Sequence, residues 1–361
     1  MDQNFGTRQG RTIYQHSLNS NELRLLKPVD ISHHSLHFQL STFDRATVPP
    51  YTAVSYTWGT ENASEIVNLN GYEIPIRPNL WSCLYHLSRA KSQFGWEHLW
   101  VDAICINQSD DTEKGAQVRY MDRTYREASS VSVWLGLPTL PDHISLPQER
   151  TSTTLKTLEV DSFDWWDSLP DLVNRPYWSR CWVIQEFLLA RNLRLYCGNS
   201  TMDFSDFQDL FCHVHGINQF SATTLNDTPY QISRGASAAE PLTMSRTMDK
   251  FPELLRPLYT LLIEHCNSEC KDPRDRVFSL LGLVTSEERA LLGRIFPDYT
   301  LSPDQVLVIT LAHLTQSLVT STRPEITPNS EDIFQGLGTI STTQPKLNID
   351  KIDNYSPGPI L

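Results

Sequence analysis

The stretch "LWVDAICINQSDDTEKGAQVRYMDRTYREASSVSVWLG", residues 99–136, decides the fold. Residues 98–106 form a near-continuous apolar run, which is typical of a strand buried on both faces. Residues 113–128 repeat apolar side chains at steps of three and four, which predicts an amphipathic helix. Residues 130–136 are β-rich and end at a glycine. The order strand, helix, strand is the unit of a parallel α/β sheet.

Further segments of the same kinds lie on both sides of this stretch. Residues 53–59, "AVSYTWG", and residues 193–198, "LRLYCG", are β-rich runs that end at a glycine. Helical spacing is found at residues 84–90, and another helix is expected at residues 164–172. The alternation predicts an α/β fold with a mostly parallel sheet and helices on both faces.

Composition and charge limit the class of protein. The chain has 361 residues, of which 40% are hydrophobic and 20% charged, as in ordinary globular proteins. The net charge is −12 and no Lys/Arg-rich stripe stands out, which argues against nucleic acid or an anionic membrane as the main partner. No run approaches the roughly 18 apolar residues that a membrane-spanning helix needs.

The cysteines and the N-terminus indicate a cellular compartment. The seven cysteines have irregular spacing, and the first residues contain no apolar segment of the kind found in signal peptides. We therefore expect a reduced, cytoplasmic setting and no disulfide among the seven cysteines.

Changes in composition divide the chain. Polar and Ser/Thr-rich segments interrupt the α/β pattern, and the C-terminal tail is rich in Thr, Ser, Pro and Asn. The expected division is a loosely ordered N-terminal segment (1–23), an α/β core (24–215), a polar linker (216–250), a helical extension (251–318) and a disordered tail (319–361).

Three blocks together resemble a known family. They are residues 51–59, residues 99–136 and residues 175–199, "RPYWSRCWVIQEFLLARNLRLYCGN". In this order they closely resemble the fungal heterokaryon-incompatibility (HET) domain. The downstream "KDPRDRVFSLLGLV" and "PDYTLSPDQV" resemble the region that commonly follows that domain, so the resemblance covers most of residues 10–315. The chain is identified as a member of the HET family.

The resemblance implies a function. HET proteins take part in self/non-self recognition after hyphal fusion, where recognition triggers cell death. The chain would then be a signalling module that acts by domain association, with protein partners and self-association, and without a certain cofactor. The HET domain also looks like a remote relative of TIR domains, which are flavodoxin-like, and some of which cleave NAD. This second resemblance implies a flavodoxin-like sheet and an alternative function as an NAD glycohydrolase, with NAD as the substrate.

Glu186 is the candidate catalytic residue of that alternative. It lies in "WSRCWVIQEFLLA", residues 178–190, which reads as a helix that is apolar nearly all round. Trp182 precedes Glu186 by four residues, and this spacing is similar to that around the catalytic glutamate of TIR domains. One carboxylate would stabilise the oxocarbenium-like charge that forms when nicotinamide leaves, and Trp182 would supply an aromatic wall.

The other interpretation of Glu186 is structural. In it the carboxylate is buried and pairs with Arg180, Arg175 or Arg191, which orders the helix. The sequence leaves both interpretations open. An open cleft beside Glu186 would favour catalysis, and closure by an arginine would favour structure.

The remaining candidate ligand-binding residues follow the predicted strands. Tyr56, Trp58 and Gly59 come at the carboxyl end of the first strand, where ligands of open α/β sheets bind. The alternative is that the two aromatic side chains are half-buried in the sheet and Gly59 only makes a turn. Asp102 is either a ligand contact or a loop carboxylate bonded to nearby backbone N–H groups. Arg180 either holds a diphosphate or pairs with a carboxylate.

The sequence contains few residues in the pattern of a metal or nucleotide motif. "CHVH" at residues 212–215 and the pair Cys266 and Cys270 offer soft ligands, but no chelating repeat has zinc spacing. No metal site is predicted. No phosphate-binding glycine fingerprint or nucleophile-elbow motif is present either.

The motif "KDPRDRVFSLLG", residues 271–282, is interpreted as structural. Asp272 suits a helix N-cap and Pro273 the first helical position. Gly282 suits the end of the helix.

Overall fold

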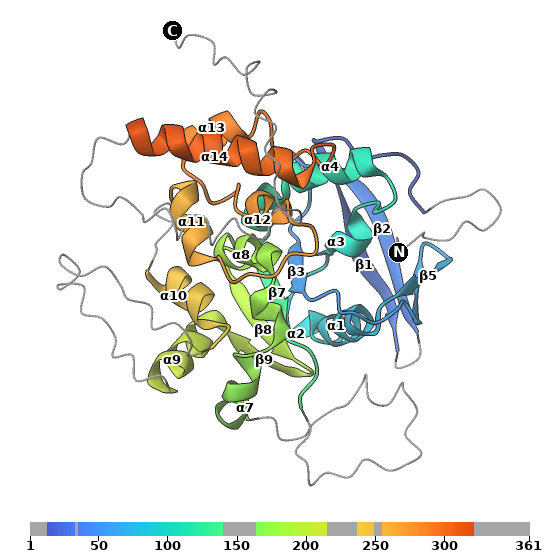
Figure 1. Ribbon diagram of the computed structural model, residues 1–361. Coiled ribbons are helices and arrows are strands. Elements are labelled where there is room, and N and C mark those ends of the chain that lie inside the picture. Colours follow the sequence, from blue (N-terminus) through green and yellow to red (C-terminus); the bar gives the residue numbers. More distant parts are fainter. Residues whose placement is uncertain (1–12, 33–34, 140–163, 215–236, 249–254, 321–361) are drawn as a thin grey trace.

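A nine-stranded mixed sheet forms the centre of the protein (Figure 1). The computed structural model describes residues 13–32, 35–139, 164–214, 237–248 and 255–320. The strand order is β5-β4-β2-β1-β6-β3-β7-β8-β9. The strands are β1 (Glu22–Ile31), β2 (Leu36–Asp44), β3 (Thr52–Tyr56), β4 (Glu65–Leu69), β5 (Tyr72–Ile76), β6 (Leu99–Trp100), β7 (Ser130–Trp134), β8 (Leu193–Cys197) and β9 (Ser200–Asp203).

The centre of the sheet is parallel and its flanks are largely antiparallel. β6, β3, β7 and β8 are adjacent and parallel, with Thr52 opposite both Leu99 and Ser130. β1 runs antiparallel to β6 and β2, β5 runs antiparallel to β4, and β9 runs antiparallel to β8, whereas β2 and β4 are parallel. All four predicted strands are therefore present in one sheet and parallel to one another.

Helices surround this sheet. They are α1 (Pro78–Arg89), α2 (Lys91–Phe94), α3 (Asp102–Cys105), α4 (Asp111–Arg119), α5 (Met121–Glu127), α7 (Trp165–Leu172), the 3₁₀ helix η1 (Pro176–Ser179), α8 (Cys181–Leu188), α9 (Phe204–Val214), α10 (Glu240–Met248), α11 (Leu258–Glu264), α12 (Asp275–Phe278), α13 (Ser286–Leu292) and α14 (Pro303–Thr320). Within the described ranges, none of them has the length and apolar character needed to span a bilayer.

Helices pack on both faces of the parallel centre. Ser55 of β3 hydrogen-bonds to Glu186 of α8, and Trp134 of β7 donates from Nε1 to Asn79 of α1. Ser55 is opposite Val133, and successive strand residues point to opposite faces. α8 therefore covers one face and α1 the other.

The predicted strand at residues 98–106 is wrong beyond residue 100. The strand β6 covers only Leu99–Trp100, and the chain then turns into α3. The carboxylate of Asp102 accepts a hydrogen bond from Ala103 N, and Cys105 N donates to Val101 O, so this segment is helical. Periodicity could not reveal the change, because a short buried helix and a buried strand are equally apolar.

Two predicted helices are divided. The helix expected at residues 113–128 is α4 and α5, which meet at Tyr120, and α4 begins earlier because the Asp110 side chain caps it. The helix expected at residues 178–190 is η1 and α8, separated by the extended residue Arg180. The break at Arg180 turns that side chain toward the carboxyl end of β3.

The chain is ordered ahead of the predicted boundary at residue 24. Leu23 is buried in β1, and Leu18 N donates to Glu113 Oε2 at 2.9 Å. Arg24 and Glu113 form a buried ion pair at 2.6 Å, which ties β1 to the first turn of α4. The strands β1, β2, β4, β5 and β9 were not predicted at all, although they extend both ends of the sheet.

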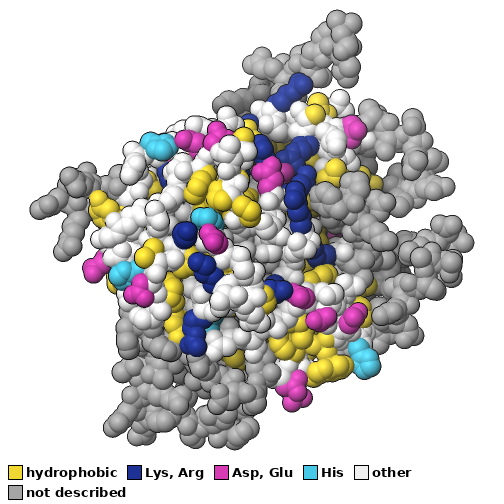
Figure 2. Space-filling view, turned by 180° about the vertical axis from the view of Figure 1, so that it is seen from behind, with side chains coloured by type: hydrophobic (Ala, Val, Ile, Leu, Met, Phe, Trp, Pro, Cys, Tyr) yellow, Lys and Arg dark blue, Asp and Glu magenta, His cyan; other side chains and the backbone are white. Residues whose placement is uncertain are grey.

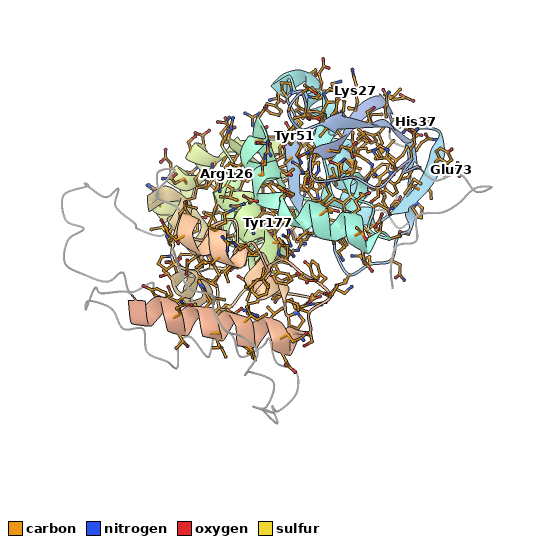
Figure 3. All side chains as sticks on the ribbon, turned by 90° about the horizontal axis from the view of Figure 1, so that it is seen from above. Lys27, His37, Tyr51, Glu73, Arg126 and Tyr177 are labelled. Atoms are coloured by element: carbon orange, nitrogen blue, oxygen red, sulfur yellow. The ribbon has the colours of Figure 1, made fainter. Side chains whose placement is uncertain are left out.

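The helical extension packs on the α8 side of the core. α11 to α13 lie within the predicted residues 251–318, and α14 ends two residues beyond them. Figure 1 shows α12 beside α8. Seen from above, α14 lies on the opposite side of the molecule from Lys27 of β1 and Glu73 of β5 (Figure 3). Arg126 of α5 donates to Gly282 O at 3.1 Å. A Cβ on Gly282 would lie 2.5 Å from Asp122 Cβ, so the two parts are in close contact.

Parts of the predicted organisation lie outside the described residues. This holds for most of the polar linker at residues 216–250, of which α10 is described, and for nearly all of the tail at residues 319–361.

In the motif at residues 271–282, Asp272 accepts a hydrogen bond from Arg274 N, and α12 begins at Asp275, two residues after the predicted start.

Candidate functional site

Glu186 belongs to a buried group of side chains from four elements. Ser55 of β3 donates to Glu186 Oε2 at 2.5 Å, and Tyr177 of η1 hydrogen-bonds to Ser55 Oγ at 2.8 Å. The hydroxyl of Tyr125 of α5 donates to Val54 O at 3.2 Å and lowers the pKa of the same carboxyl. Glu186 itself is 2% exposed. These four residues, the Glu186 cluster, join α8 to the face of β3 and to α5.

Burial controls the charge of this carboxyl. Loss of water raises the pKa of Glu186 to about 7, while the nearby Arg180 charge lowers it and the Asp102 charge raises it. Arg180 donates to the backbone oxygen of Tyr56, and its charge also acts on Asp102. Near neutral pH, therefore, Glu186 is divided between its acid and its carboxylate form.

The arginines expected to pair with Glu186 are mostly engaged elsewhere. Arg175 makes an ion pair with Asp171 at 2.6 Å and donates to Leu135 O at 2.7 Å. Arg180 affects Glu186 through its charge, and no direct ion pair between these two described residues is present. The direct partner is the Ser55 hydroxyl, which the sequence did not predict.

Asp102 and Trp58 form a second small group beside Arg180. Trp58 Nε1 donates to Asp102 Oδ2 at 2.9 Å, and Ala103 N donates to Oδ1 at 2.7 Å. Burial raises the pKa of Asp102, and the Arg180 charge lowers it. Asp102 thus makes the backbone contact expected of a loop carboxylate.

Gly59 follows Trp58 and has φ +74°, which favours glycine. Its backbone oxygen accepts a hydrogen bond from Arg77 Nη1 at 2.7 Å. Gly59 therefore makes the turn out of β3 that the sequence predicted, with Arg77 holding it in place.

The other two candidate residues point away from Glu186. Tyr56 is opposite Trp134 in the sheet and lies on the α1 face, where burial raises its pKa. Trp182 hydrogen-bonds to Asp275 of the extension, which also accepts from Tyr299 at 2.7 Å. Neither ring forms a wall beside Glu186.

Two cavities lie elsewhere in the described part of the molecule. One, of about 340 Å³, is lined by Arg119, Gln185 and Arg289 at the seam between the core and the extension. The other, of about 580 Å³, is lined by Thr52 and Ser130 at the amino ends of the parallel strands. Glu186 lines neither cavity. Glu186 is buried, so neither of these two cavities gives a ligand access to its carboxyl.

Within the described ranges, no three His, Cys, Asp or Glu side chains are grouped closely enough to hold a metal ion. The arrangement stabilises a buried carboxyl through the Ser55 hydroxyl and the nearby Arg180 charge, and it holds α8 against the sheet.

Comparison with known proteins gives one family and one relative. Residues 51–186 match the family model described as "Heterokaryon incompatibility protein (HET)". The chain is 27% identical over 356 residues to "Heterokaryon incompatibility protein 6, OR allele" of Neurospora crassa, a match that covers 81% of the chain. It covers 51% of the relative, so the chain spans about half the length of the curated protein it matches. No solved structure matches.

Proposed function

We propose that the chain acts in fungal recognition of self and non-self after hyphal fusion, as its match to the heterokaryon incompatibility (HET) family model implies. The observation that carries the proposal is the match over residues 51–186, together with a relative named for the same process. That relative is about twice as long, so the activity of the whole protein, its trigger and its partners belong to the proposal as well.

We further propose that the chain acts by association with other protein chains rather than by chemistry. The buried Glu186 supports this, since its carboxyl accepts a hydrogen bond from Ser55 and lines neither of the two cavities described above. Large apolar side chains on the surface offer contact points, and Figure 2 shows apolar side chains scattered among polar ones on the rear face. The most exposed are Val29, Ile66, Trp166, Leu291 and Val308.

The strand order supports a flavodoxin-like relationship as part of the same proposal. Counted along the chain, the parallel strands β3, β6, β7 and β8 are the first to the fourth. Their order in space is second, first, third, fourth, which is the order at the centre of flavodoxin-like sheets. The flanking antiparallel strands are additions to that arrangement.

The function is tested in a fungus that lacks its own copy of the gene. One strain expresses the full chain from an inducible promoter and is paired with strains that do or do not recognise it, and growth arrest and death of fused cells are scored. We expect death only in the mismatched pairing. Equal growth of both pairings at confirmed expression contradicts a role in incompatibility.

The mode of action is tested with Glu186→Gln in the same assay. The variant removes the charge but keeps the size of a buried side chain, so a module that acts by association should keep its response. Glu287→Gln, at an exposed position in the first turn of α13, is the matched control. If Glu186→Gln folds normally, as judged by circular dichroism, and abolishes both cell death and NAD consumption, then association without chemistry is wrong.

A further inference from the structure

Two cysteines from distant parts of the chain are neighbours at the start of α8. Cys181 is the first residue of that helix, and Cys270 lies between α11 and α12 in the extension. Two backbone hydrogen bonds join the segments that contain these cysteines. Glu269 N donates to Ser179 O at 2.5 Å, and Cys181 N donates to Glu269 O at 3.0 Å, which makes an isolated β-bridge. The bridge is parallel and pairs Arg180 with Glu269. The residues that follow a parallel pair are themselves neighbours, and their side chains point the same way.

The two thiols are within reach of a covalent bond. Backbones paired in this way lie about 4.8 Å apart. A disulfide needs Cα atoms roughly 4.4–6.8 Å apart, so the backbone would not have to move far. The Cys270 side chain lies close enough to the Cys181 thiol to be the main cause of its raised pKa. Both are reduced in this structure.

We propose that Cys181 and Cys270 are an oxidative modification site, at which hydrogen peroxide forms a reversible disulfide that joins the HET domain to the helical extension. The inference rests on the register of the bridge and on the thiol contact. It does not depend on the proposed role in incompatibility.

The difference in exposure between the two thiols determines which cysteine is oxidised first. Cys181 is 3% exposed, and Cys270 is half-buried. Contact with Cys270 and burial raise the pKa of Cys181, so its thiol stays protonated. Because the thiolate is the reactive form, Cys181 reacts more slowly with peroxide. Cys270 is therefore oxidised first.

The reaction proceeds in two balanced steps. The Cys270 thiolate attacks one peroxide oxygen, the O–O bond breaks, and the products are a sulfenic acid and hydroxide, which takes up a proton to become water. The sulfur of Cys181 then attacks the sulfenic sulfur, the S–O bond breaks, and the thiol proton leaves with the hydroxyl as a second water. Two thiols and one peroxide thus give one disulfide and two waters. A dithiol such as dithiothreitol reverses the reaction by exchange.

The remaining buried thiols are unsuited to this reaction. Cys83, Cys105 and Cys197 lie in the core, and burial raises the pKa of each. Cys266 is half-buried, as Cys270 is, and lies four residues before it. Cys266 is not on the bridge to α8, which makes it a matched control.

The disulfide would hold the first turn of α8 against the extension. Arg180, immediately before Cys181, is the residue whose charge acts on both Glu186 and Asp102. A link at Cys181 would therefore fix that arginine as well as the seam between the two parts. It would also restrict the unfolded chain by closing a long loop.

The test uses the purified full chain with a graded series of hydrogen peroxide concentrations, followed by non-reducing peptide mapping and thermal unfolding. We expect a single linked peptide pair containing Cys181 and Cys270. We also expect the melting temperature to rise by roughly 5 °C and to return on addition of dithiothreitol. Cys266→Ser should behave like the wild type, whereas Cys270→Ser should lose both the linked pair and the rise.

Other results would overturn the proposal. One is Cys181 that remains fully alkylatable after unfolding while Cys270 carries a sulfinic or sulfonic acid. Another is Cys270 linked to Cys266. A third is the same change in melting temperature in the wild type and in Cys270→Ser. Because Cys270 is half-buried, its serine variant should fold, and circular dichroism before oxidation checks this.

Discussion

At the scale of single residues, Glu186 behaves as a buried acid rather than as an exposed carboxylate. Its Oε2 accepts a hydrogen bond from Ser55, whose hydroxyl also hydrogen-bonds to Tyr177. Burial raises the pKa of Glu186 from 4.5 to about 7. Folding therefore binds a proton between those two values, and the stability that the neutral form gives is lost as the pH rises through 7.

This titration can be measured by comparison with Glu186→Gln, which has no proton to lose. Between pH 5 and pH 8 the wild type should lose roughly 2 to 3 kcal/mol more of its free energy of unfolding than the variant does. Urea unfolding at a series of pH values gives both curves. The contribution of Glu186 is the difference between them.

Comparison with a variant is needed because other buried groups titrate in the same range. Burial and the Arg256 charge lower the pKa of His265 to about 4, so its contribution to stability is lost as the pH falls from about 6.5. That effect has the opposite sign and cancels in the difference. Glu287→Gln should run parallel to the wild type. If the Glu186→Gln curve also runs parallel, Glu186 does not titrate as described.

The sequence could single out Glu186 but not its surroundings. A carboxylate among tryptophans on an apolar helix is visible in the sequence, and so is the turn at Gly59. The partner Ser55 is 131 residues away and has no feature that separates it from other strand serines. The orientation of Trp182 toward Asp275 depends on the extension, which helical periodicity alone does not position.

At the scale of elements, the extension is attached to the core at a glycine. Gly282 lies against Asp122 of α5 and Gln185 of α8, and a Cβ there would lie 2.5 Å and 2.7 Å from their nearest atoms. Gly282→Ala should therefore separate the two surfaces and cost about 2 kcal/mol of stability. Thermal unfolding measures the loss, which should appear as a lower melting temperature.

The same substitution elsewhere is the control. Gly115 lies within α4, and a Cβ there would meet nothing within 4 Å. Gly115→Ala should stabilise the protein by up to about 1 kcal/mol, because alanine has the higher helix propensity. If both alanine variants change stability alike, Gly282 is not a close contact between the core and the extension.

The elements that the sequence predicted correctly are those with a strong local signal. The β-rich runs that end at a glycine became β3, β7 and β8, and Asp164 caps α7 as the expected helix start requires. The elements that were missed depend on partners. β1 is buried on both faces at residues 23–26 and partly exposed beyond them, and β9 is only four residues long, so pairing with neighbouring strands is what identifies these two.

At the scale of the whole molecule, the family match ends at an earlier residue than the packed structure does. The match ends at residue 186, inside α8. Beyond it, β8 pairs with β7 from Val131 to Trp134, and α10 and α12 pack against α8. The region that comparison recognises is therefore only part of the packed structure.

This difference has a practical consequence for truncated versions of the protein. Cutting after residue 186 would remove β8 and leave β7 as an unprotected edge strand, with free backbone groups along a run of buried residues. A fragment of residues 1–186 should accumulate in inclusion bodies or as large species on size-exclusion chromatography, whereas residues 1–320 should elute as a compact particle. A compact and stable 1–186 fragment would show instead that the matched region folds by itself. Otherwise, assays of that region alone would report the behaviour of a misfolded chain.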